Sequence, residues 1–400
     1  MTRSFVLEPA QRVIRRYIRR SEIAPMDRHM YYEPSEFSPE RPPKKDRKHM
    51  LCLLISAHNE ELVLAKTIKS AIAAGMSREH IFVVDDNSED LTSQIARSIV
   101  PSENVIRVHR SGKGLALSKA AKRFRLTKRY SWVHIADADG AFSPDYFYVF
   151  RRELRVKNAA ATGYVRSLPG KRISEYRVYE YTIGMEVHRR LQTLLNVVPV
   201  IPGPTSCFRA DVFDKVNFDN KSLTEDFDVT LQLHRQNLGS VQFIPQAIAY
   251  TQDPKNLKDY TKQITRWNRG GLQSMMRHRI GRQPTRIDAY LTYQIMQNLL
   301  FFASYLIWVP YLALTRSASL VISSAFVVDV LVTFIITFMA ASRSRRWDVL
   351  SGFPQVYLLR WVSLGVFLKA FVEVVVLGKH RHTDGQWENR ASRRYVVDVS

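Results

Sequence analysis

Residues 50–56 read MLCLLIS and residues 81–86 read IFVVDD, and a helical pattern over Glu60–Ala74 separates these two apolar runs. A second helical pattern follows over Leu91–Val100. The alternation of strand, helix, strand and helix predicts a parallel sheet with helical crossovers, which is an α/β fold. Ligands of such sheets bind beyond the carboxyl ends of the strands. The polar residues that directly follow each apolar run are therefore the first candidates for a binding site.

The composition narrows the class of protein. Four hundred residues exceed the usual size of one domain, and uncharged apolar runs gather near the C-terminal end. A net charge of +22 suits anionic lipid head groups or a diphosphate-bearing substrate. Nucleic acid is not expected as a partner, because Lys and Arg are spread along the chain without a basic helix that carries aromatic side chains. Two cysteines, Cys52 and Cys207, are too few for a disulfide network or a zinc site, which fits a reducing cytosol.

The sequence divides into five regions. Residues 1–49 lack the apolar core of a signal peptide, and within Pro9–Arg20 apolar and basic residues recur at helical spacing. This pattern predicts a basic amphipathic helix that lies on a membrane or packs on the main domain, followed by a linker rich in Pro, Glu and Lys. The other four regions are an α/β domain (50–260), interfacial helices (261–290), a transmembrane or re-entrant region (291–378) and a basic tail (379–400).

Three apolar segments predict a membrane region. Leu291–Thr315 and Ser319–Ala341 are long enough to cross a bilayer, and Asp329 is their one acidic residue. The third, Val349–Gly378, is interrupted by proline and charged residues, so it is expected to be partly interfacial or re-entrant, with a full crossing left open. The basic loop Arg343–Arg346 should lie in the cytosol together with the α/β domain. We therefore expect an integral membrane protein whose main domain faces the cytosol.

Two pairs of aspartates follow predicted strands. Asp137 and Asp139 stand one residue apart after the run Trp132–Ala136, so both side chains point to the same face and can share a divalent ion. Carboxylate and diphosphate oxygens together suit Mg or Mn, although the same residues also suit a turn. Asp85 and Asp86 close the second strand, where a carboxylate can accept a hydrogen bond from a pyrimidine ring or a ribose hydroxyl, or cap the next helix.

Two later motifs carry further candidates. Thr224-Glu225-Asp226 precedes an apolar helical pattern, and its carboxylates suit proton transfer. The alternative is that Thr224 caps the helix while Glu225 and Asp226 interact favourably with its dipole. The second motif, Gln263-Ile-Thr-Arg266-Trp267, offers a guanidinium for phosphate and an indole face for a pyranose. The same five residues also suit an amphipathic helix with its Trp at the bilayer surface.

In this order, the motifs resemble those of the family 2 inverting, nucleotide-sugar-dependent glycosyltransferases, which include cellulose, chitin, hyaluronan and bacterial poly-N-acetylglucosamine synthases. The resemblance covers roughly residues 50–280. It implies a GT-A type domain with a mixed, mostly parallel sheet and flanking helices, followed by interfacial and transmembrane helices. It also implies that Asp139 is the metal ligand, that Asp137 lies against the nucleotide, and that Asp226 is the general base within the Thr224–Asp226 motif.

The resemblance extends to further contacts. The loop Ser56–Glu61 is similar to the first nucleotide-contacting loop of the family, with Glu60 in its place and Ser56 where a proline is common. Lys113 belongs to a basic glycine loop that approaches the nucleotide; it lacks the spacing of a P-loop, and a surface hairpin is the other interpretation. Arg266 is expected to contact the diphosphate, Trp267 to form a platform for the acceptor sugar, and Gln263 to line the same wall. Residues 201–209 resemble the loop near the acceptor, with the cysteine later than is usual.

The resemblance predicts a membrane-bound inverting hexosyltransferase. It would move a hexose or N-acetylhexosamine from a UDP-sugar to a growing glycan through a β linkage, with processive extension favoured. The nearest alternative is a single transfer to a lipid acceptor of the ceramide or polyprenyl-phosphate type, because two or three membrane segments are few for a polymer channel. The remote alternative is a basic membrane scaffold or nucleic-acid binder without activity. Membrane lipids are further expected partners, and a homo-oligomer is left open.

Overall fold

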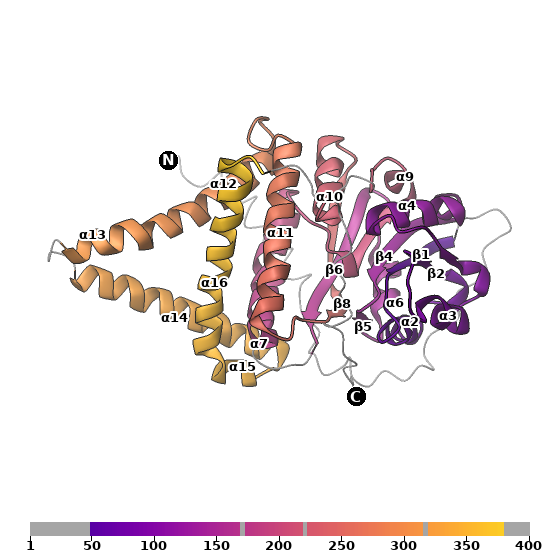
Figure 1. Cartoon of the computed structure of the whole chain (residues 1–400), viewed down its shortest axis with the longest axis horizontal. Helices are drawn as coiled ribbons and strands as arrows, with labels where there is room; N and C mark the ends of the chain where they lie inside the picture. The colour runs from indigo at the N-terminus through magenta and orange to yellow at the C-terminus, as the bar shows by residue number, and fades with distance from the viewer. Residues whose placement is uncertain (1–48, 169–172, 219–221, 315–318, 380–400) are drawn as a thin grey trace, which may run out of the picture. The chain divides into compact units, whose positions relative to one another are not determined.

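The computed structural model describes residues 49–168, 173–218, 222–314 and 319–379 (Figure 1). These residues all belong to one compact unit of the chain. The amphipathic helix expected within Pro9–Arg20, most of the linker that follows it, and the basic tail from residue 380 onward lie outside the described residues.

Eight strands form one mixed sheet in the described part of the chain. They are β1 (His49–Ala57), β2 (Ile81–Asp85), β3 (Val105–Arg107), β4 (Tyr130–Asp137), β5 (Ala141–Phe142), β6 (Asn158–Ser167), β7 (Ser206–Arg209) and β8 (Ser240–Thr251). Their order in the sheet is β3-β2-β1-β4-β7-β6-β8-β5. The pairs β1–β2, β1–β4, β2–β3 and β6–β8 are parallel, and the other three pairs are antiparallel. The predicted mixed, mostly parallel sheet is therefore confirmed.

Helices flank the sheet and continue beyond it. The main ones are α2 (Leu64–Ala73), α3 (Thr92–Ile99), α4 (Lys113–Arg123), α5 (Leu126–Arg129), α6 (Tyr146–Glu153), α7 (Ile173–Thr182), α8 (Arg190–Leu195), α9 (Ala210–Phe213), α10 (Glu225–Arg235), α11 (Leu257–Arg277), α12 (Arg286–Ala303), α13 (Val309–Leu314), α14 (Ser319–Ser344), α15 (Asp348–Ser351) and α16 (Phe353–Phe371). Seven-residue and five-residue π-helical stretches join some of them: η5 (Ile183–Arg189), η7 (Ser304–Trp308) and η8 (Val372–Val376).

Alternate residues of β1 enter two different hydrophobic cores. Leu53 and Ile55 pack with residues of α2, α3 and α6 on one face of the sheet. Cys52 and Leu54 pack with residues of α4, α5 and α9 on the other face. A strand that is covered on both faces needs apolar side chains at successive positions, because neither face meets water. This is why residues 50–55 are continuously apolar and do not alternate with polar residues.

The carboxyl ends of β1, β2 and β4 meet at one edge of the sheet. In the parallel register, Ser56 of β1 pairs with Asp137 of β4, and Ala57 of β1 pairs with Asp85 of β2. The polar residues that follow these three strands therefore lie side by side, as expected for the ligand edge of such a sheet.

Helix α11 connects the sheet half to the apolar helices that follow it. It packs along α16 and also contacts α10 (Figure 1). Helix α7 contacts both α14 and α16. A shared core joins these helices: Tyr176 of α7, Tyr260 of α11, Ala340 of α14 and Leu359 of α16 are buried in one cluster.

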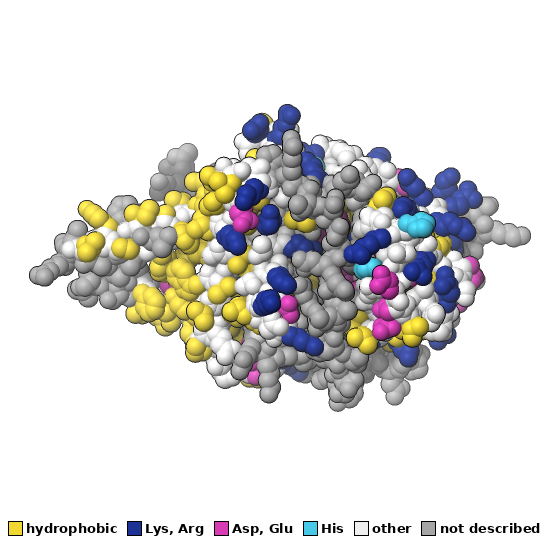
Figure 2. Space-filling model, viewed as in Figure 1, with side chains coloured by type: hydrophobic (Ala, Val, Ile, Leu, Met, Phe, Trp, Pro, Cys, Tyr) yellow, Lys and Arg dark blue, Asp and Glu magenta, His cyan; other side chains and the backbone are white. Residues whose placement is uncertain are grey.

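One stretch of the described residues, Phe326–Ser344 of α14, is long and apolar enough to cross a membrane. Figure 2 shows apolar side chains gathered over the helices that follow the sheet, whereas Lys and Arg side chains are frequent over the sheet half. The other predicted crossing, Leu291–Thr315, contains the end of α12, then η7 and α13, so a π-helical stretch interrupts its α-helix. A second crossing therefore stays a prediction.

The third apolar segment is more regular than its sequence suggested. Pro354 lies in the first turn of α16, where a missing N–H disturbs no helical hydrogen bond, and the helix continues to Phe371. Arg360 of α16 donates to Asp329 Oδ2 of α14 at 2.5 Å and to Thr333 Oγ1 at 2.6 Å. Charged side chains among apolar helices need such partners, so this pair stabilises the contact between α14 and α16.

Candidate active site

Two loops at the carboxyl ends of β1 and β2 hold each other in place. The Asn59 backbone N–H donates to Ser88 Oγ at 2.9 Å, and the Glu60 backbone N–H donates to Thr92 Oγ1 at 2.8 Å. Glu60 is buried in this contact. The predicted first nucleotide loop is therefore fixed against the loop that follows β2.

Asp85 and Asp86 are buried, and both carboxylates accept hydrogen bonds from the protein itself. Asp85 accepts from a backbone N–H of the following loop at 2.8 Å and from the Ser93 hydroxyl in α3. Asp86 accepts from the backbone N–H groups of Ser111 and Gly112 at 2.8 and 2.9 Å. Asp85 thus stabilises the start of α3. Asp86 holds the basic glycine loop, at Ser111 and Gly112, against the end of β2.

Lys113 joins carboxylates from two distant parts of the chain. Its Nζ lies 2.7 Å from Asp137 Oδ1 and 2.6 Å from Glu225 Oε1. Gly112 precedes it at the N-cap of α4 with φ of 82°, a backbone conformation that favours glycine. Burial by itself lowers the pKa of Lys113, but the carboxylates of Asp137, Glu225 and Asp226 outweigh it and raise that pKa, so the ammonium stays charged. The surface-hairpin interpretation is wrong, because the lysine is directed into this cluster.

The residues Thr224, Glu225 and Asp226 open α10 beside Lys113. Thr224 holds the N-cap position, but its side chain makes no capping hydrogen bond, and its buried Oγ1 has no hydrogen-bond partner among the described residues. Burial tends to raise the pKa of Glu225, but Lys113 lowers that pKa below its usual range. Burial and the Glu225 charge raise the pKa of Asp226 to about 6. One carboxylate thus stays ionised while its neighbour can exchange a proton near neutral pH.

Helix α11 carries the predicted Gln-x-x-Arg-Trp motif (263–267) and packs on the loop before α10. Arg266 Nη1 donates to the carbonyl oxygen of Leu223 at 3.2 Å. One turn later, a Cβ on Gly270 would lie 2.6 Å from Thr224 Oγ1, which is closer than such atoms approach. Glycine at this position therefore allows α11 to touch the segment that contains Thr224. The two motifs, far apart in sequence, lie against each other.

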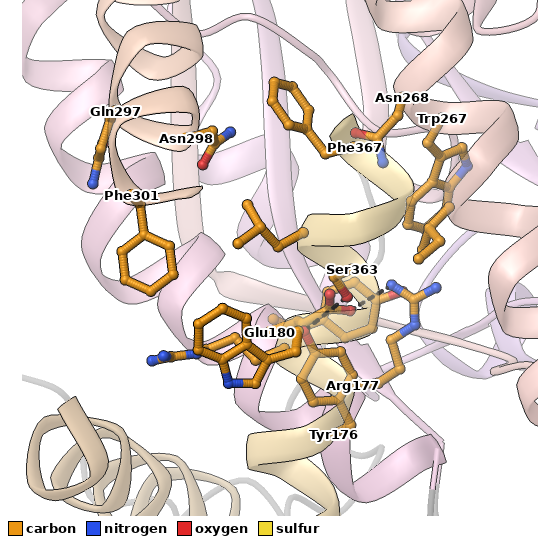
Figure 3. A pocket seen from close by; sticks show the side chains of 15 residues that line it. Tyr176, Arg177, Glu180, Trp267, Asn268, Gln297, Asn298, Phe301, Ser363 and Phe367 are labelled. Carbon is orange, nitrogen blue, oxygen red and sulfur yellow. Dashed lines mark hydrogen bonds and ion pairs between the residues drawn. The ribbon is translucent and has the colours of Figure 1, made fainter. Parts of the chain in front are cut away.

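A cavity of about 550 Å³ lies between α7, α11, α12 and α16 (Figure 3). Trp267 is 38% exposed and contributes to its wall. Aromatic rings and side-chain amides make up much of the lining, including Trp267, Phe301, Trp361, Asn268, Gln297 and Asn298. Aromatic faces combined with amide groups suit a ligand that presents both apolar and hydroxyl surface.

Arg177 is a member of this site that the sequence analysis missed. It is buried in α7, donates to Glu180 Oε2 at 2.7 Å, and donates to Gln263 Oε1. Its guanidinium carbon lies 4.8 Å from the ring centroid of Trp267. Gln263 is 86 residues away in sequence and α7 matches no motif, so the one available signal was an arginine among the tyrosines of that helix.

The metal-binding residues were predicted at the end of β4. Asp137 closes that strand and is paired with Lys113, and Asp139 lies within electrostatic range of Tyr181 of α7. The described part of the chain contains no cluster of three or more His, Cys, Asp or Glu side chains that could hold a metal ion. A divalent ion held by Asp137 and Asp139 would therefore need further oxygen ligands, such as those of a diphosphate.

Comparisons with known proteins all indicate a glycosyltransferase. The family model described as Glycosyl transferase family group 2 matches residues 132–342, which is more than half of the chain. A poly-beta-1,6-N-acetyl-D-glucosamine synthase of Staphylococcus aureus (strain COL) is 26% identical over 243 residues, which cover 58% of this chain and 57% of that relative. A probable glycosyltransferase, YdaM, of Bacillus subtilis (strain 168) is 26% identical over 245 residues, 54% of each chain. The chain thus matches little more than half the length of these relatives.

Among solved structures, the chain is similar to the mannosyltransferase PcManGT from Pyrobaculum calidifontis. The TM-score is 0.49 at 15% sequence identity, over 81% of this chain and 90% of that chain.

Proposed function

Because this chain belongs to glycosyl transferase family group 2, we propose that it moves a hexose or N-acetylhexosamine from a UDP-sugar to a growing glycan with inversion, giving a β linkage. Nucleotide-sugar-dependent glycosyl transfer is the activity of the family. One observation carries the rest of the proposal: Lys113 pairs with both Asp137 and Glu225, which brings the end of β4 next to the start of α10, where Asp226 lies. Donor and base would therefore share one site.

The donor side of the proposed site is the edge formed by β1, β2 and β4. Asp137 and Asp139 would hold a Mg or Mn ion, which would neutralise the leaving diphosphate when bound. Lys113 adds a fixed positive charge beside Asp137. Arg266 would add a guanidinium, whose planar N–H groups match phosphate oxygens.

The proposed chemical step depends on Asp226. The acceptor hydroxyl oxygen attacks the anomeric carbon, its proton passes to the Asp226 carboxylate, and the bond from the anomeric carbon to UDP breaks on the opposite face. With a pKa raised to about 6, Asp226 is a stronger base than an ordinary aspartate and is still ionised at pH 7. Lys113 keeps Glu225 ionised, so the proton is directed to Asp226.

The lining of the cavity favours a glycan over a lipid chain as the acceptor. Ile264 and Leu364 are its aliphatic members, whereas rings, amides, charged groups and the hydroxyl of Ser363 make up the rest. An acyl or prenyl chain gains most from aliphatic neighbours, while a pyranose packs on an aromatic face and hydrogen-bonds through its rim. Trp267 is the proposed platform for the acceptor sugar.

Membrane attachment through α14 is part of the proposal. Apolar side chains of α14 that are at least half exposed include Phe326, Val328, Leu331 and Ile335, which suits contact with lipid. The far end of α14 packs on α7, so the basic residues 343–346 lie near the catalytic half. A cytosolic catalytic half would then follow from these positive charges.

The purified full chain, mixed with a panel of UDP-sugars and Mg or Mn, tests the function by release of UDP. A ladder of product lengths supports glycan extension, whereas one discrete glycolipid supports the single transfer to lipid. Absence of UDP release from every sugar nucleotide, together with steeply salt-dependent affinity for nucleic acid, would favour the scaffold instead.

The pH dependence of kcat/KM should show an acidic limb near pH 6. The Asp226 carboxyl is protonated below its folded pKa of about 6 and then accepts no proton, so the rate should rise tenfold for each pH unit until about pH 6 and then level off. Initial rates between pH 4.5 and 8 measure this limb. A limb near pH 4 would mean that Asp226 titrates as an ordinary aspartate and is not poised as proposed.

Replacement of Gly203 by Ala should reduce transfer without unfolding the protein. The new Cβ would lie 2.8 Å from Asp137 Oδ2 and 2.9 Å from Lys113 Nζ, so this ion pair must shift. Both atoms end flexible side chains, so the fold accommodates the change, but a misplaced active-site pair should lower kcat by about tenfold or more. Gly184→Ala is the matched control, because a Cβ there meets no atom within 4 Å. Equal rates for the two variants would contradict the role of the pair.

A further inference from the structure

We infer that Arg177 is the positioning residue of the acceptor site: from α7, it fixes the ring of Trp267 and the side-chain amide of Gln263, and so sets the affinity for the acceptor. This inference rests on the proposed function. Arg177 lies outside the Gln-x-x-Arg-Trp motif, but it contacts two of the residues in that motif.

The guanidinium of Arg177 uses its edge and its face for different partners. Along its edge, Nη1 donates to Glu180 Oε2 at 2.7 Å, and Nη2 donates to Gln263 Oε1. On its face, the guanidinium carbon Cζ lies 4.8 Å from the ring centroid of Trp267 and 4.9 Å from the ring centroid of Tyr260. A planar cation can hold hydrogen-bonding partners and stacked rings together, which the compact ammonium of a lysine cannot do.

The contact with Gln263 sets the direction of its amide. Because the oxygen accepts from Arg177, the NH₂ group is the end that remains to contact another molecule. The NH₂ group is a hydrogen-bond donor, and the hydroxyl and ring oxygens of a sugar can accept from it. Arg177 lines the cavity and thereby fixes a hydrogen-bond donor on Gln263, which does not line the cavity itself but precedes the lining residue Ile264 in α11.

Trp267 needs such a restraint because it is partly exposed. At 38% exposure, its indole has fewer packing partners than a core residue, so a stacked guanidinium contributes much of what orients the ring. A platform that binds a pyranose face must be held in one orientation before the sugar arrives, since ordering it on binding would cost affinity.

Arg177 is itself held by its ion pair with Glu180 in α7, which Figure 3 draws beside it. Glu180 also accepts from Tyr260 Oη of α11 at 3.1 Å, and Tyr260 in turn bonds Ser363 of α16. Tyr176 Oη lies 3.0 Å from the same serine hydroxyl. If Arg177 and Glu180 served only to stabilise α7 by their ion pair, the hydrogen bonds to Tyr260 and Ser363 would have no part in that role. The network places α7, α11 and α16 around the cavity as one unit.

A double-mutant cycle between Arg177→Lys and Trp267→Phe tests the inference in the full-length enzyme. Lysine keeps a charge for Glu180 but loses the planar fork, so the acceptor KM should rise about tenfold while the UDP-sugar KM stays within about twofold. In the Trp267→Phe background, Arg177→Lys should raise the acceptor KM by less than about threefold, because its partner ring has already changed. Arg152→Lys is the matched control: Arg152 is exposed and lies 5.8 Å from the Tyr148 ring, away from the cavity.

The outcomes separate the inference from the function on which it rests. Additive effects in the cycle, or an equal rise in the two KM values, would overturn the positioning role while the function stands. A wild-type protein that releases no UDP would overturn both. If Arg177→Lys fails to fold, Glu180→Gln replaces it: a weaker anchor should raise the acceptor KM about threefold and leave the donor KM unchanged, and an unchanged acceptor KM would overturn the inference.

Discussion

Replacement of Asp226 by Asn is expected to lower kcat by about 10³-fold, while the dissociation constant of the UDP-sugar stays within about threefold. Asn has the same shape, and its side-chain oxygen can still accept from the Phe227 backbone N–H, as Asp226 Oδ1 does at 2.8 Å. The ion pair of Lys113 with Glu225 also remains. The amide, however, cannot take a proton from the acceptor hydroxyl. Single-turnover release of UDP measures the chemical step, and a donor titration measures binding.

The stability of this variant should move in the direction opposite to its activity. The folded pKa of Asp226 is about 6, against 3.8 for an ordinary aspartate, so between these values the folded state binds more protons than the unfolded state. The free energy of unfolding therefore falls as the pH rises through that window, and at pH 7 the ionised carboxylate destabilises the fold. Asp226→Asn removes this penalty, so the unfolding temperature at pH 7 should stay equal or rise.

Asp228→Asn is the matched control on the same helix. Asp228 is buried and accepts from Arg277 Nη1 at 3.0 Å and from Gln232 Nε2 at 2.9 Å. Loss of its charge should lower the unfolding temperature and leave most of the turnover. If Asp226→Asn keeps normal turnover, or loses turnover only because it unfolds, the assignment of the base is wrong.

The meeting of Asp85 and Asp137 at one edge of the sheet could be predicted because it depends on where parallel strands end. A continuous apolar run marks a strand buried on both faces, and parallel strands end at a common edge, so Asp85 and Asp137 had to lie near each other. Their partners in the register, Ala57 and Ser56, are adjacent in β1. The prediction that Asp85 and Asp137 lie near each other did not require knowledge of where their side chains point.

Side-chain direction is what the sequence did not reveal. Asp86 was expected to contact the substrate, which stays a prediction, and the structure adds that its oxygens accept from the backbone N–H groups of Ser111 and Gly112. Both roles need a carboxylate at the end of a strand, so the residue type does not distinguish them. Thr224 was a plausible helix cap by its position, yet its hydroxyl makes no capping hydrogen bond and instead lies where Gly270 of α11 packs closely.

The contacts of Arg177 with Gln263 and Trp267 join residues that are far apart in sequence. Arg177 and Gln263 meet only because α7 and α11 both pack on α16, and no local pattern in either helix encodes that meeting. The structural role of Pro354 was also not evident from the sequence. Its position within an apolar segment suggested a break in that segment, but Pro354 lies in the first turn of α16. Whether a proline interrupts or starts a helix depends on where the previous helix ends.

Replacement of Asp139 by Ala is expected to weaken donor binding in the presence of Mn by about 100-fold, since even the outer partners of metal ligands contribute 10- to 100-fold to affinity. The described residues contain no cluster of three or more His, Cys, Asp or Glu side chains that could hold a metal ion, so each of the two carboxylates would carry a large share of the affinity for the ion. Asp137 is paired with Lys113 at 2.7 Å, so the lysine ammonium would compete with the ion for the oxygens of Asp137. Calorimetric titration of the UDP-sugar with and without EDTA measures the effect.

Donor binding measured with and without EDTA shows whether the weaker binding of Asp139→Ala comes from loss of the metal. If Asp139 acts through the metal, chelation should weaken donor binding by the wild-type protein to the level of Asp139→Ala, and should change the variant little. Asp211→Ala controls for the loss of a carboxylate elsewhere, because Asp211 is half-exposed and pairs with Arg209 beyond the end of β7. A variant that binds the donor as tightly as wild type in Mn would remove Asp139 from the metal site. Donor binding that is unaffected by EDTA in the wild type would instead leave Lys113 and the arginines as the groups that neutralise the diphosphate.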